Sequence, residues 1–371
     1  MVWRNETNRS GYFLKPKHMT KMKKILVTLF IAIPAVVLAG NPDRSGEAGA
    51  SELLINPWAQ SSGWYGLNIA SVRGVEAPNI NVAGLSFLEG SQIEFCRTEW
   101  LVGSEISLTT FGFAQKVGDG AIGLTLTSMD LGEIEVTTTE SPDGTGAYYK
   151  PRFSNLGLSY SRKFADYLSG GVTVRVITES ISDVKAIGVS MDVGIQYISG
   201  PAEHPEQIKM GIALKNIGTP MKFSGDGLSF RGNVPDGDYS MTQDFRAETF
   251  ELPSLLTIGV SYDFYFGQEH RLTAVGNFVS NSFYKDQFGA GLEYALKVKN
   301  TEMFMLRAGY RYESGITDDV ERTSASTGIA AGLTFQYPID KLGNNLVALN
   351  YSYRTSYQYE GSHCFGLRLS F

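Results

Sequence analysis

The chain has 371 residues, of which 43% are hydrophobic, 12% aromatic and 19% charged, with two cysteines and a formal net charge of −6. This composition is too apolar and too aromatic for a disordered chain, and two cysteines cannot staple a chain of this length. The absence of a run of 18 or more apolar residues excludes a helical membrane bundle, whereas 41 glycines and many aromatic residues favour β structure with many turns.

Residues 1–39 are predicted to be a secretory signal peptide rather than part of the fold. The basic stretch Lys21–Lys24 precedes an apolar stretch, Ile25–Leu38, which ends at small residues before Gly40. This order is typical of a signal peptide, and the alternative is a short buried helix. The residues before Met19 are interpreted as an extended or over-called start. Because no cysteine follows the predicted cleavage site, lipoprotein anchoring is not supported.

Removal of the predicted signal peptide changes the charge of the chain. Residues 1–39 contain seven of the 32 basic and one of the 38 acidic side chains, so the remaining 332 residues have 25 basic and 37 acidic groups, a net charge of −12. An exported chain of this sign is a poor partner for nucleic acid.

Residues 40–91 lack a regular alternation and are rich in Gly, Ala and Asn. They contain two of the four tryptophans, Trp58 and Trp64. A segment of this length is too long for a simple tail, and its apolar residues need burial. We therefore predict that it packs in the lumen of the domain that follows, as a hatch. The alternative is a periplasmic plug or a partly disordered arm.

Residues 92–371 alternate with a period of two, as strands do. In residues 329–337, for example, large or apolar residues at odd positions alternate with small or polar ones. A soluble β-sandwich also alternates. However, these segments run about nine to thirteen residues, near the length of a tilted membrane-spanning strand. Tyr and Phe also gather at their ends, as in an interfacial girdle. The pattern therefore favours a transmembrane barrel.

Fourteen strands are predicted, and the predicted fold is an all-β, antiparallel outer-membrane barrel. The strands are expected to start near residues 93, 105, 121, 154, 171, 185, 207, 254, 270, 287, 302, 325, 345 and 363. An even number places both chain ends on the periplasmic side. The two longest connections, 130–152 and 218–253, then face the outside, and 134–139 is expected to extend a hairpin above the membrane.

The last predicted strand ends in a terminal aromatic residue. Phe365, Leu367, Leu369 and Phe371 alternate with smaller or polar residues. This ending resembles the signal that the outer-membrane barrel-assembly machinery reads. The expected partners are therefore this machinery and the lipid of the outer membrane.

Three short motifs in residues 48–90 resemble a family signature. They are Ala48-Gly49-Ala50-Ser51-Glu52-Leu53-Leu54-Ile55, Gly74-Val75-Glu76-Ala77 and Asn81-Val82-Ala83-Gly84-Leu85. They resemble A-G-x-x-E-L-L-I, G-x-E-A and W-N-P-A-G-L of the PorV/PorQ family of outer-membrane proteins, which is similar to FadL-type fourteen-stranded barrels. Ile80 and Val82 stand where Trp and Pro are usual. The predicted hatch motif is Glu52, Leu53, Leu54, Ile55, Gly74, Glu76, Ala77, Asn81, Ala83, Gly84 and Leu85.

This resemblance implies a non-enzymatic role in type IX protein secretion. PorV-like proteins bind the C-terminal signal of secreted cargo and associate with a translocon barrel, so cargo and translocon become expected partners. FadL-like members instead pass hydrophobic small molecules across the outer membrane, which is the alternative function. A structural, porin-like barrel is a third interpretation.

No catalytic, cofactor or metal site is predicted. The three histidines outside the signal peptide, His204, His270 and His363, are far apart in sequence, and none has a neighbouring Ser or Asp arrangement that suggests a triad. HExxH, P-loop and CxxC motifs are absent.

Four arginines fall at inward positions of the last strands: Arg307, Arg311, Arg354 and Arg368. Because these strands are neighbours in a meander, the four guanidinium groups are predicted to share one basic wall. Such a wall would hold the hatch or an anionic group. The alternative is a structural ion-pair network with Glu293 and Glu313 in a polar lumen.

The two cysteines, Cys96 and Cys364, fall on the first and last strands, at positions predicted to face the lumen. These strands pair where a barrel closes, and an exported protein meets oxidising conditions. A disulfide across the seam is therefore possible, provided that the register brings the Cα atoms within about 7 Å.

Overall fold

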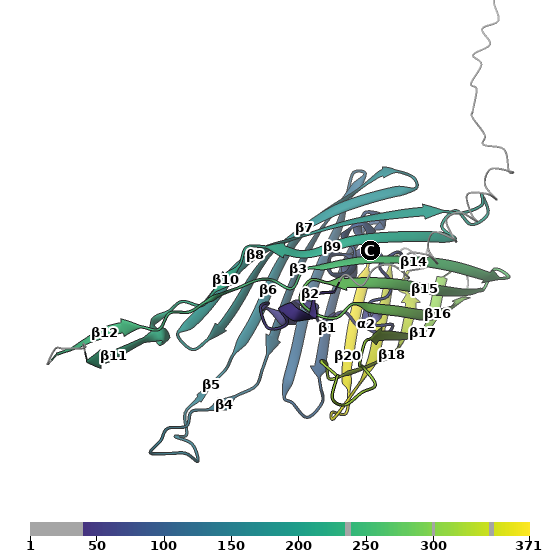
Figure 1. Ribbon diagram of the computed structural model, residues 1–371. Helices are drawn as coiled ribbons and strands as arrows, with labels where there is room; N and C mark the ends of the chain where they lie inside the picture. Colours follow the sequence, from purple (N-terminus) through teal and green to yellow (C-terminus); the bar gives the residue numbers. More distant parts are fainter. Residues whose placement is uncertain (1–39, 234–238, 299–300, 341–344) are drawn as a thin grey trace, which may run out of the picture. The chain divides into compact units, whose positions relative to one another are not determined.

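The computed structural model describes residues 40–233, 239–298, 301–340 and 345–371, so the predicted signal peptide lies outside the described residues. Fourteen antiparallel strands form a closed barrel in chain order, and β20 pairs with β1 to close it (Figure 1). The strands are β1 (Ser91–Trp100), β2 (Ile106–Val117), β3 (Gly120–Asp130), β6 (Arg152–Ala165), β7 (Leu168–Ile181), β8 (Val184–Ser199), β9 (Ile208–Gly218), β14 (Leu255–Phe266), β15 (His270–Asn281), β16 (Gln287–Val298), β17 (Thr301–Glu313), β18 (Ser326–Pro338), β19 (Leu346–Ser356) and β20 (Ser362–Ser370). The predicted barrel is confirmed, and each strand starts within three residues of its predicted position.

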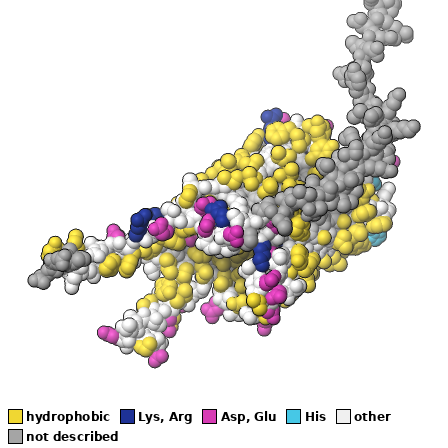
Figure 2. Space-filling view, in the orientation of Figure 1, with side chains coloured by type: hydrophobic (Ala, Val, Ile, Leu, Met, Phe, Trp, Pro, Cys, Tyr) yellow, Lys and Arg dark blue, Asp and Glu magenta, His cyan; other side chains and the backbone are white. Residues whose placement is uncertain are grey.

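The outward face of the barrel is apolar and the inward face is mixed. On β8, six outward side chains are each more than a third exposed: Ile187, Val189, Met191, Val193, Ile195 and Tyr197. Their inward neighbours Ser190, Asp192 and Gln196 are buried. Hydrophobic side chains also cover much of the barrel surface seen in Figure 2. A closed barrel with this surface requires lipid around it, which identifies an outer-membrane protein.

The long connections extend from one end of the barrel. β4 (Ile134–Glu135) pairs with β5 (Tyr148–Tyr149), which confirms the predicted hairpin extension in the first long connection. In the second, β10 (Met221–Lys222) pairs with β13 (Thr249–Phe250), and β11 (Ser229–Asn233) pairs with β12 (Ser240–Asp244). Strand ends Ser91 and Ser370 lie at the opposite end, which we therefore take as periplasmic and call the inner end.

Residues 40–90, the N-terminal segment, form short helices joined by turns. These are η2 (Pro42–Arg44), η3 (Ser51–Leu54), α2 (Ala59–Ser62), η4 (Gly74–Glu76), α3 (Ala77–Ile80) and η5 (Val82–Phe87). Among the described residues, no helix combines the length and hydropathy needed to cross a bilayer. Gly66 and Gly74 adopt positive φ angles, a conformation that L side chains rarely take, and they turn the chain between these helices.

The N-terminal segment packs against inward-facing glycines on several strands. A Cβ atom on Gly112 of β2 would lie 2.6 Å from the ring of Trp58, and one on Gly309 of β17 would lie 2.7 Å from the backbone of Trp64. Gly211 of β9 lies equally close to the backbone of Ile69. The glycines thus leave room for this segment within the barrel. Whether it acts as a hatch, a movable barrier, stays a prediction.

Candidate functional site

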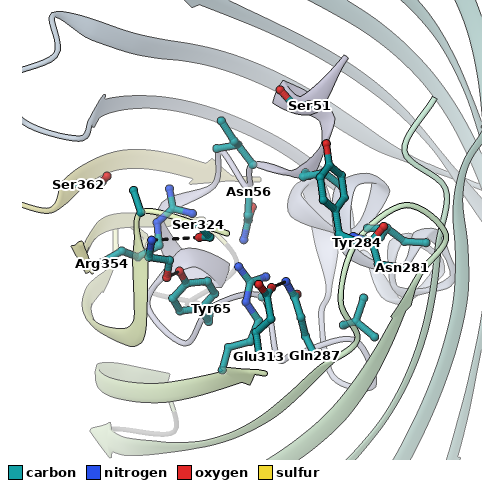
Figure 3. Close-up of a pocket in the computed structure, with 18 of the residues that line it drawn as sticks. Ser51, Asn56, Tyr65, Asn281, Tyr284, Gln287, Glu313, Ser324, Arg354 and Ser362 are labelled. Carbon is teal, nitrogen blue, oxygen red and sulfur yellow. Dashed lines mark hydrogen bonds between the residues drawn. The ribbon is translucent and has the colours of Figure 1, made fainter. Parts of the chain in front are cut away.

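A cavity of about 360 Å³ lies at the outer end of the barrel, above the N-terminal segment (Figure 3). We call it the outer cavity. Its floor includes Leu54, Ile55 and Tyr65 from the N-terminal segment. Its walls come from the outer ends of several strands and include the apolar side chains of Trp100, Leu255 and Val279. The cavity has the size of a small-molecule site, and its lining combines hydrophobic side chains with polar ones.

Three cations line the outer cavity: Lys215 of β9, Arg311 of β17 and Arg354 of β19. Within the part of the chain that the structure describes, none of them forms an ion pair with a carboxylate. The guanidinium of Arg311 stacks on Tyr65 at 4.0 Å, and one Nη atom of Arg354 is buried without a partner. The cavity therefore combines hydrophobic walls with uncompensated positive charge.

One acidic side chain, Glu313, is found among the described residues that line the outer cavity. Its carboxylate is already occupied, because it accepts hydrogen bonds of 2.7 Å from Gln287 Nε2 and from Thr323 Oγ1. Figure 3 shows Glu313 and Gln287 on one side of the cavity. Glu313 therefore does not neutralise the three cations by direct pairing.

A second cavity, of about 400 Å³, lies on the inner side of the N-terminal segment. We call it the inner cavity. Trp64 and Asn68 line it, whereas Tyr65 and Ile69 line the outer cavity, so residues 64–69 form part of the partition between the two. The lining of the inner cavity contains five acidic and five basic side chains. Its charge is therefore balanced, unlike that of the outer cavity.

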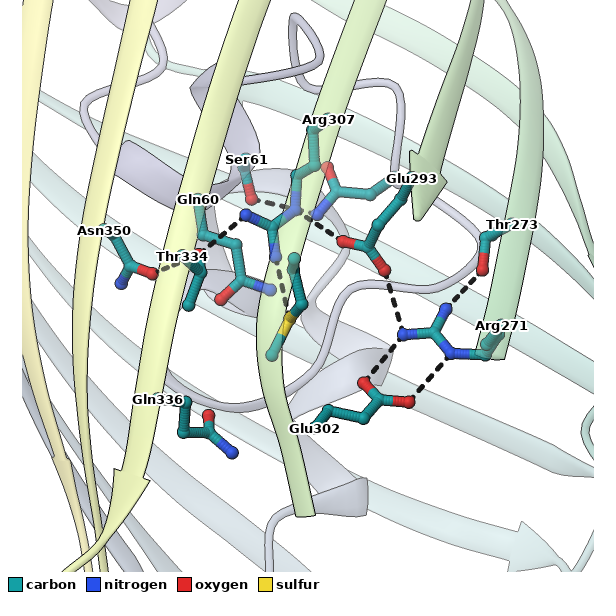
Figure 4. Close-up of polar contacts among 12 residues, drawn as sticks. Gln60, Ser61, Arg271, Thr273, Glu293, Glu302, Arg307, Thr334, Gln336 and Asn350 are labelled. Atoms are coloured by element: carbon teal, nitrogen blue, oxygen red, sulfur yellow. Dashed lines mark hydrogen bonds and ion pairs between the residues drawn. The ribbon is translucent and has the colours of Figure 1, made fainter. Parts of the chain in front are cut away.

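Most of the charges of the inner cavity pair with one another (Figure 4). Arg271 binds Glu302 at 2.8 Å and Glu293 at 3.0 Å, and Lys209 pairs with Asp263. The network continues from Glu293 to Arg307. From there it follows the hydrogen bonds Arg307–Thr334, Thr334–Asn350 and Asn350–Glu94. Side chains from successive strands are thus joined from β14 to β19 and on to β1. Of the ion-pair network considered as the alternative to the basic wall, the Arg307–Glu293 pair is therefore present.

The four arginines of the predicted basic wall do not form one group. Arg311 and Arg354 line the outer cavity, and Arg368 lines the inner cavity, where it donates a 2.5 Å hydrogen bond to Gln60 Oε1. Arg307 is buried between them in its ion pair with Glu293. Alternation shows which side chains face inward but not how far along the barrel axis they lie. Four residues, the spacing of Arg307 and Arg311, span roughly 13 Å of strand. A single wall is therefore not the arrangement found.

The predicted hatch motif residues hold the N-terminal segment together and to the barrel. Glu76 accepts hydrogen bonds from the backbone N–H groups of Gln60 and Ser61, at 3.2 and 3.0 Å, and from the Ser61 hydroxyl. Burial raises the pKa of Glu76, although the bond from Ser61 and the charges of Arg368 and Arg307 oppose this. A carboxylate at this point satisfies the first N–H groups of helix α2.

Asn81 plays a comparable part. Its side-chain oxygen accepts from Ala83 N–H at 3.2 Å, and its amide donates to the carbonyls of Ile69 and of Ile195 on β8, both at 3.0 Å. The remaining motif residues are spread through the fold. Ala77, Ala83, Gly84 and Leu85 are buried around α3 and η5, and Gly74 packs against Gln92. Leu54 and Ile55 line the outer cavity. Glu52 and Leu53 lie at the β10–β13 hairpin.

The predicted disulfide between Cys96 and Cys364 is not formed in this structure. Both thiols are free and buried. In the β1–β20 register, Cys96 lies opposite Gly366, and Cys364 lies opposite Thr98. The two cysteines are therefore diagonal neighbours, whose Cβ atoms are usually farther apart than the ~3.5–4.5 Å of a disulfide. The sequence could not supply this two-residue offset.

The other predicted residues are placed as follows. Phe365, Leu367, Leu369 and Phe371 are exposed, and recognition by the assembly machinery stays a prediction. His204 stacks on Tyr265, whereas His270 and His363 hydrogen-bond to the hydroxyls of Tyr294 and Tyr351. No group of three potential metal ligands occurs among the described residues. Lys215 was missed in the sequence because a single lysine in an alternating strand carries no distinctive signal.

No protein-family model and no curated protein matches this chain. The solved structures do contain similar folds. The chain aligns with the toluene transporter TbuX of Ralstonia pickettii with a TM-score of 0.51 and 13% identity, over 84% of this chain and 99% of TbuX. For CymD, a monoaromatic hydrocarbon channel, the TM-score is 0.51 with 13% identity, over 86% of this chain and 98% of CymD.

A third match is a deletion mutant of the monoaromatic hydrocarbon channel TodX, with a TM-score of 0.53 and 15% identity, over 84% of this chain and 96% of that one. This chain has the fold of these outer-membrane channels. At such identities the similarity concerns the fold alone. It does not test the membership of the PorV/PorQ family that the motifs suggest.

Proposed function

We propose that this protein is a non-enzymatic outer-membrane transporter that takes up hydrophobic small molecules carrying an acidic group. The observation that carries the proposal is the outer cavity, where apolar walls and three cations without carboxylate partners meet. This is the FadL-like alternative from the sequence, made more specific by the lining. The titles of TbuX, CymD and TodX name toluene and monoaromatic hydrocarbons, which supports the hydrophobic part of the ligand.

The outer cavity suits the two ends of such a molecule differently. A hydrocarbon portion gains free energy by contact with Trp100, Leu255 and Val279, because apolar surface leaves water. A carboxylate accepts charge-assisted hydrogen bonds from such unpaired cations, of which Arg354 has a buried Nη without a partner. A neutral hydrocarbon would leave these donors unpaired, which costs affinity.

The two cavities differ in how their cations are compensated. None of the three cations of the outer cavity pairs with a carboxylate, whereas in the inner cavity Arg271, Lys209 and Arg73 are paired and, among the described residues, Arg368 and Lys297 form no ion pair. The outer cavity also has one acidic side chain against five in the inner cavity, so it is the more favourable of the two for an anion.

Calorimetric titration of the protein in nanodiscs tests the proposal. The probes are dodecanoate and dodecanol, which differ in charge and not in chain length. We expect dodecanoate to bind more tightly, and the double variant Lys215→Gln with Arg354→Gln to lose at least about tenfold for dodecanoate while dodecanol is little affected. Lys222→Gln, on the exposed hairpin, is the matched control. Equal affinity of the wild type for both probes would overturn the proposal.

We infer a second candidate function, type IX secretion, from a different observation. Three apolar side chains on one face of the β11–β12 hairpin, Phe230, Met241 and Phe245, are exposed, and the rings of Phe230 and Phe245 stack at 4.5 Å. An exposed apolar face on a projecting hairpin suits a protein partner. Together with the motif resemblance, it supports contact with secreted cargo or a translocon barrel.

Capture with an immobilised type IX C-terminal cargo domain tests this second candidate. Retention of the wild type, and its loss in Phe230→Ser with Phe245→Ser, is the supporting result. Ile187→Ser, on the lipid-facing side of β8, is the control for general hydrophobic adhesion. Absence of retention of the wild type would remove the candidate.

A further inference from the structure

Two carboxylates are buried together near the outer end of the barrel. Glu52 belongs to η3 and is 9% exposed, and neither of its side-chain oxygens has a hydrogen-bond partner. Glu179 lies on β7, opposite Ala186 of β8, and is 6% exposed. Both carboxylates therefore border one apolar cluster, to which Ala186 and Leu53, the neighbour of Glu52, belong.

The surroundings of this pair are apolar. Residues from the N-terminal segment, β7, β8 and the β10–β13 hairpin form one cluster, namely Ala50, Leu53, Ile177, Ala186, Met221 and Leu252, with Phe223 and Phe250 packed against it. Met221 and Ile177 are completely buried. A carboxylate in such a place is strongly disfavoured when it is charged and unpaired.

Among the described residues, no cation compensates the pair. On β8 and β10, Lys185 and Lys222 are exposed and form no ion pair. Arg175, the inward-facing basic residue of β7, binds Asp192 at 2.8 Å. Beside β13, the exposed Glu251 binds Arg44 at 3.0 Å, outside the apolar cluster.

The pair lies where the N-terminal segment contacts the β10–β13 hairpin, which we call the outer hairpin. Gly49 N–H donates to the carbonyl of Glu251 at 3.0 Å, and Glu251 N–H donates to the carbonyl of Glu47 at 3.3 Å. The ring of Phe250 covers Gly49, where a side chain would not fit. We call this contact, residues 47–53 with residues 221 and 250–252, the outer latch.

A buried pair of acids without a cation partner needs either a proton or a bound metal ion. Calcium in proteins takes six to eight oxygen ligands, and the apolar cluster supplies two carboxylates. A proton on Glu52 needs no such set of ligands. Burial, with the charge of Glu179 as a further cause, raises the pKa of Glu52 to about 7, from an ordinary value of 4.5.

We propose that Glu52 carries a proton when the outer latch is closed, and that loss of this proton loosens the N-terminal segment from the outer hairpin. The latch is fully stable below pH 4.5, because Glu52 is then protonated whether the latch is closed or open. It weakens as the pH rises to about 7, since the open form releases the proton more readily. This inference concerns how the segment is held and goes beyond the proposed transport.

Hydrogen exchange measured by mass spectrometry at pH 4.5 to 8.5, on the protein in nanodiscs, tests the latch. Rates are expressed as protection factors, which remove the intrinsic effect of pH on exchange. We expect the protection of residues 47–53 to fall at least about tenfold over this range, while that of residues 82–88 stays constant. In Glu52→Gln, protection should be high at every pH. Glu248→Gln, an exposed acid on the same hairpin, should behave as the wild type.

A second variant and the addition of calcium complete the test. If Glu52→Gln does not assemble, Glu179→Gln is the second variant. Glu52 stays buried in this variant but loses a neighbouring charge, so the pH dependence should be reduced. Wild-type protection that does not change with pH would overturn the proposal, as would an unchanged pH dependence in the Gln variants. Recovery of protection at pH 8.5 on addition of calcium chloride would also overturn it, because the pair would then hold a metal ion rather than a proton.

Discussion

The guanidinium group of Arg354 lies over the indole ring of Trp100, with its carbon 4.6 Å from the ring centroid. The two residues come from β19 and β1, which are separated in the barrel by β20. Stacking on the ring fixes the plane of the guanidinium and leaves its N–H groups free at the edge. One of these nitrogens is buried without a partner, so the stack presents an oriented donor to the outer cavity.

This stack gives the first prediction. In Trp100→Leu the cavity keeps an apolar wall, but Arg354 loses the ring on which it stacks. That interaction is worth about 1 kcal/mol, or roughly fivefold in affinity. We therefore expect the ratio of dodecanoate to dodecanol affinity to fall about fivefold in calorimetric titrations. Tyr337→Leu, on the exposed face of β18, should leave the ratio unchanged. A wild-type ratio in Trp100→Leu would show that the stack does not orient Arg354.

The second prediction concerns Glu76, which binds the first N–H groups of α2. In Glu76→Gln a neutral amide replaces a charged acceptor, and its NH₂ group can face those N–H groups, at a cost of about 1–3 kcal/mol. We expect hydrogen-exchange protection of residues 59–66 to fall at least about fivefold, while the folded barrel keeps its heat-modifiable mobility in gels. Glu89→Gln, an exposed neighbour in sequence, is the control. Unchanged protection would mean that α2 is held by packing alone.

The third prediction uses two glycines on the barrel strands. A Cβ atom on Gly112 would lie 2.5 Å from Val75 and 2.6 Å from Trp58, whereas one on Gly276 would find no other atom within 3.8 Å. Gly112→Ala should therefore displace the N-terminal segment and lower the thermal midpoint of the protein by several degrees, because overpacking costs about 1–3 kcal/mol. Gly276→Ala should have little effect. Equal midpoints for the two variants, by calorimetry, would contradict the close packing described here.

The strands could be predicted because membrane barrels impose a simple rule on sequence. Each residue faces either lipid or lumen, so alternation in stretches such as 187–197 marks a strand and its two faces directly. The motifs around Glu76 and Asn81 also marked residues that prove to hold the N-terminal segment. Both kinds of signal are local in sequence, which is why they were visible before the fold.

The features that the sequence did not determine depend on quantities that alternation does not contain. Arg307 and Arg311 face the same side of β17, but the height that separates them places only Arg311 in the outer cavity. The offset between Cys96 and Cys364 depends on the register of β1 with β20. Glu52 gave no sign of an unusual environment, because the residues that bury it, such as Met221, come from a distant hairpin. Heights, registers and long-range neighbours require the three-dimensional structure.

The central claim is that the outer cavity binds the acidic and the hydrophobic ends of one molecule. A crystal structure of the protein with 12-bromododecanoate tests it most directly, because the anomalous signal of bromine locates the hydrocarbon end. We expect a bromine peak against Leu255 and Val279, with the carboxylate at Arg354. A fully bound ligand whose bromine and carboxylate both lie outside the outer cavity would contradict it.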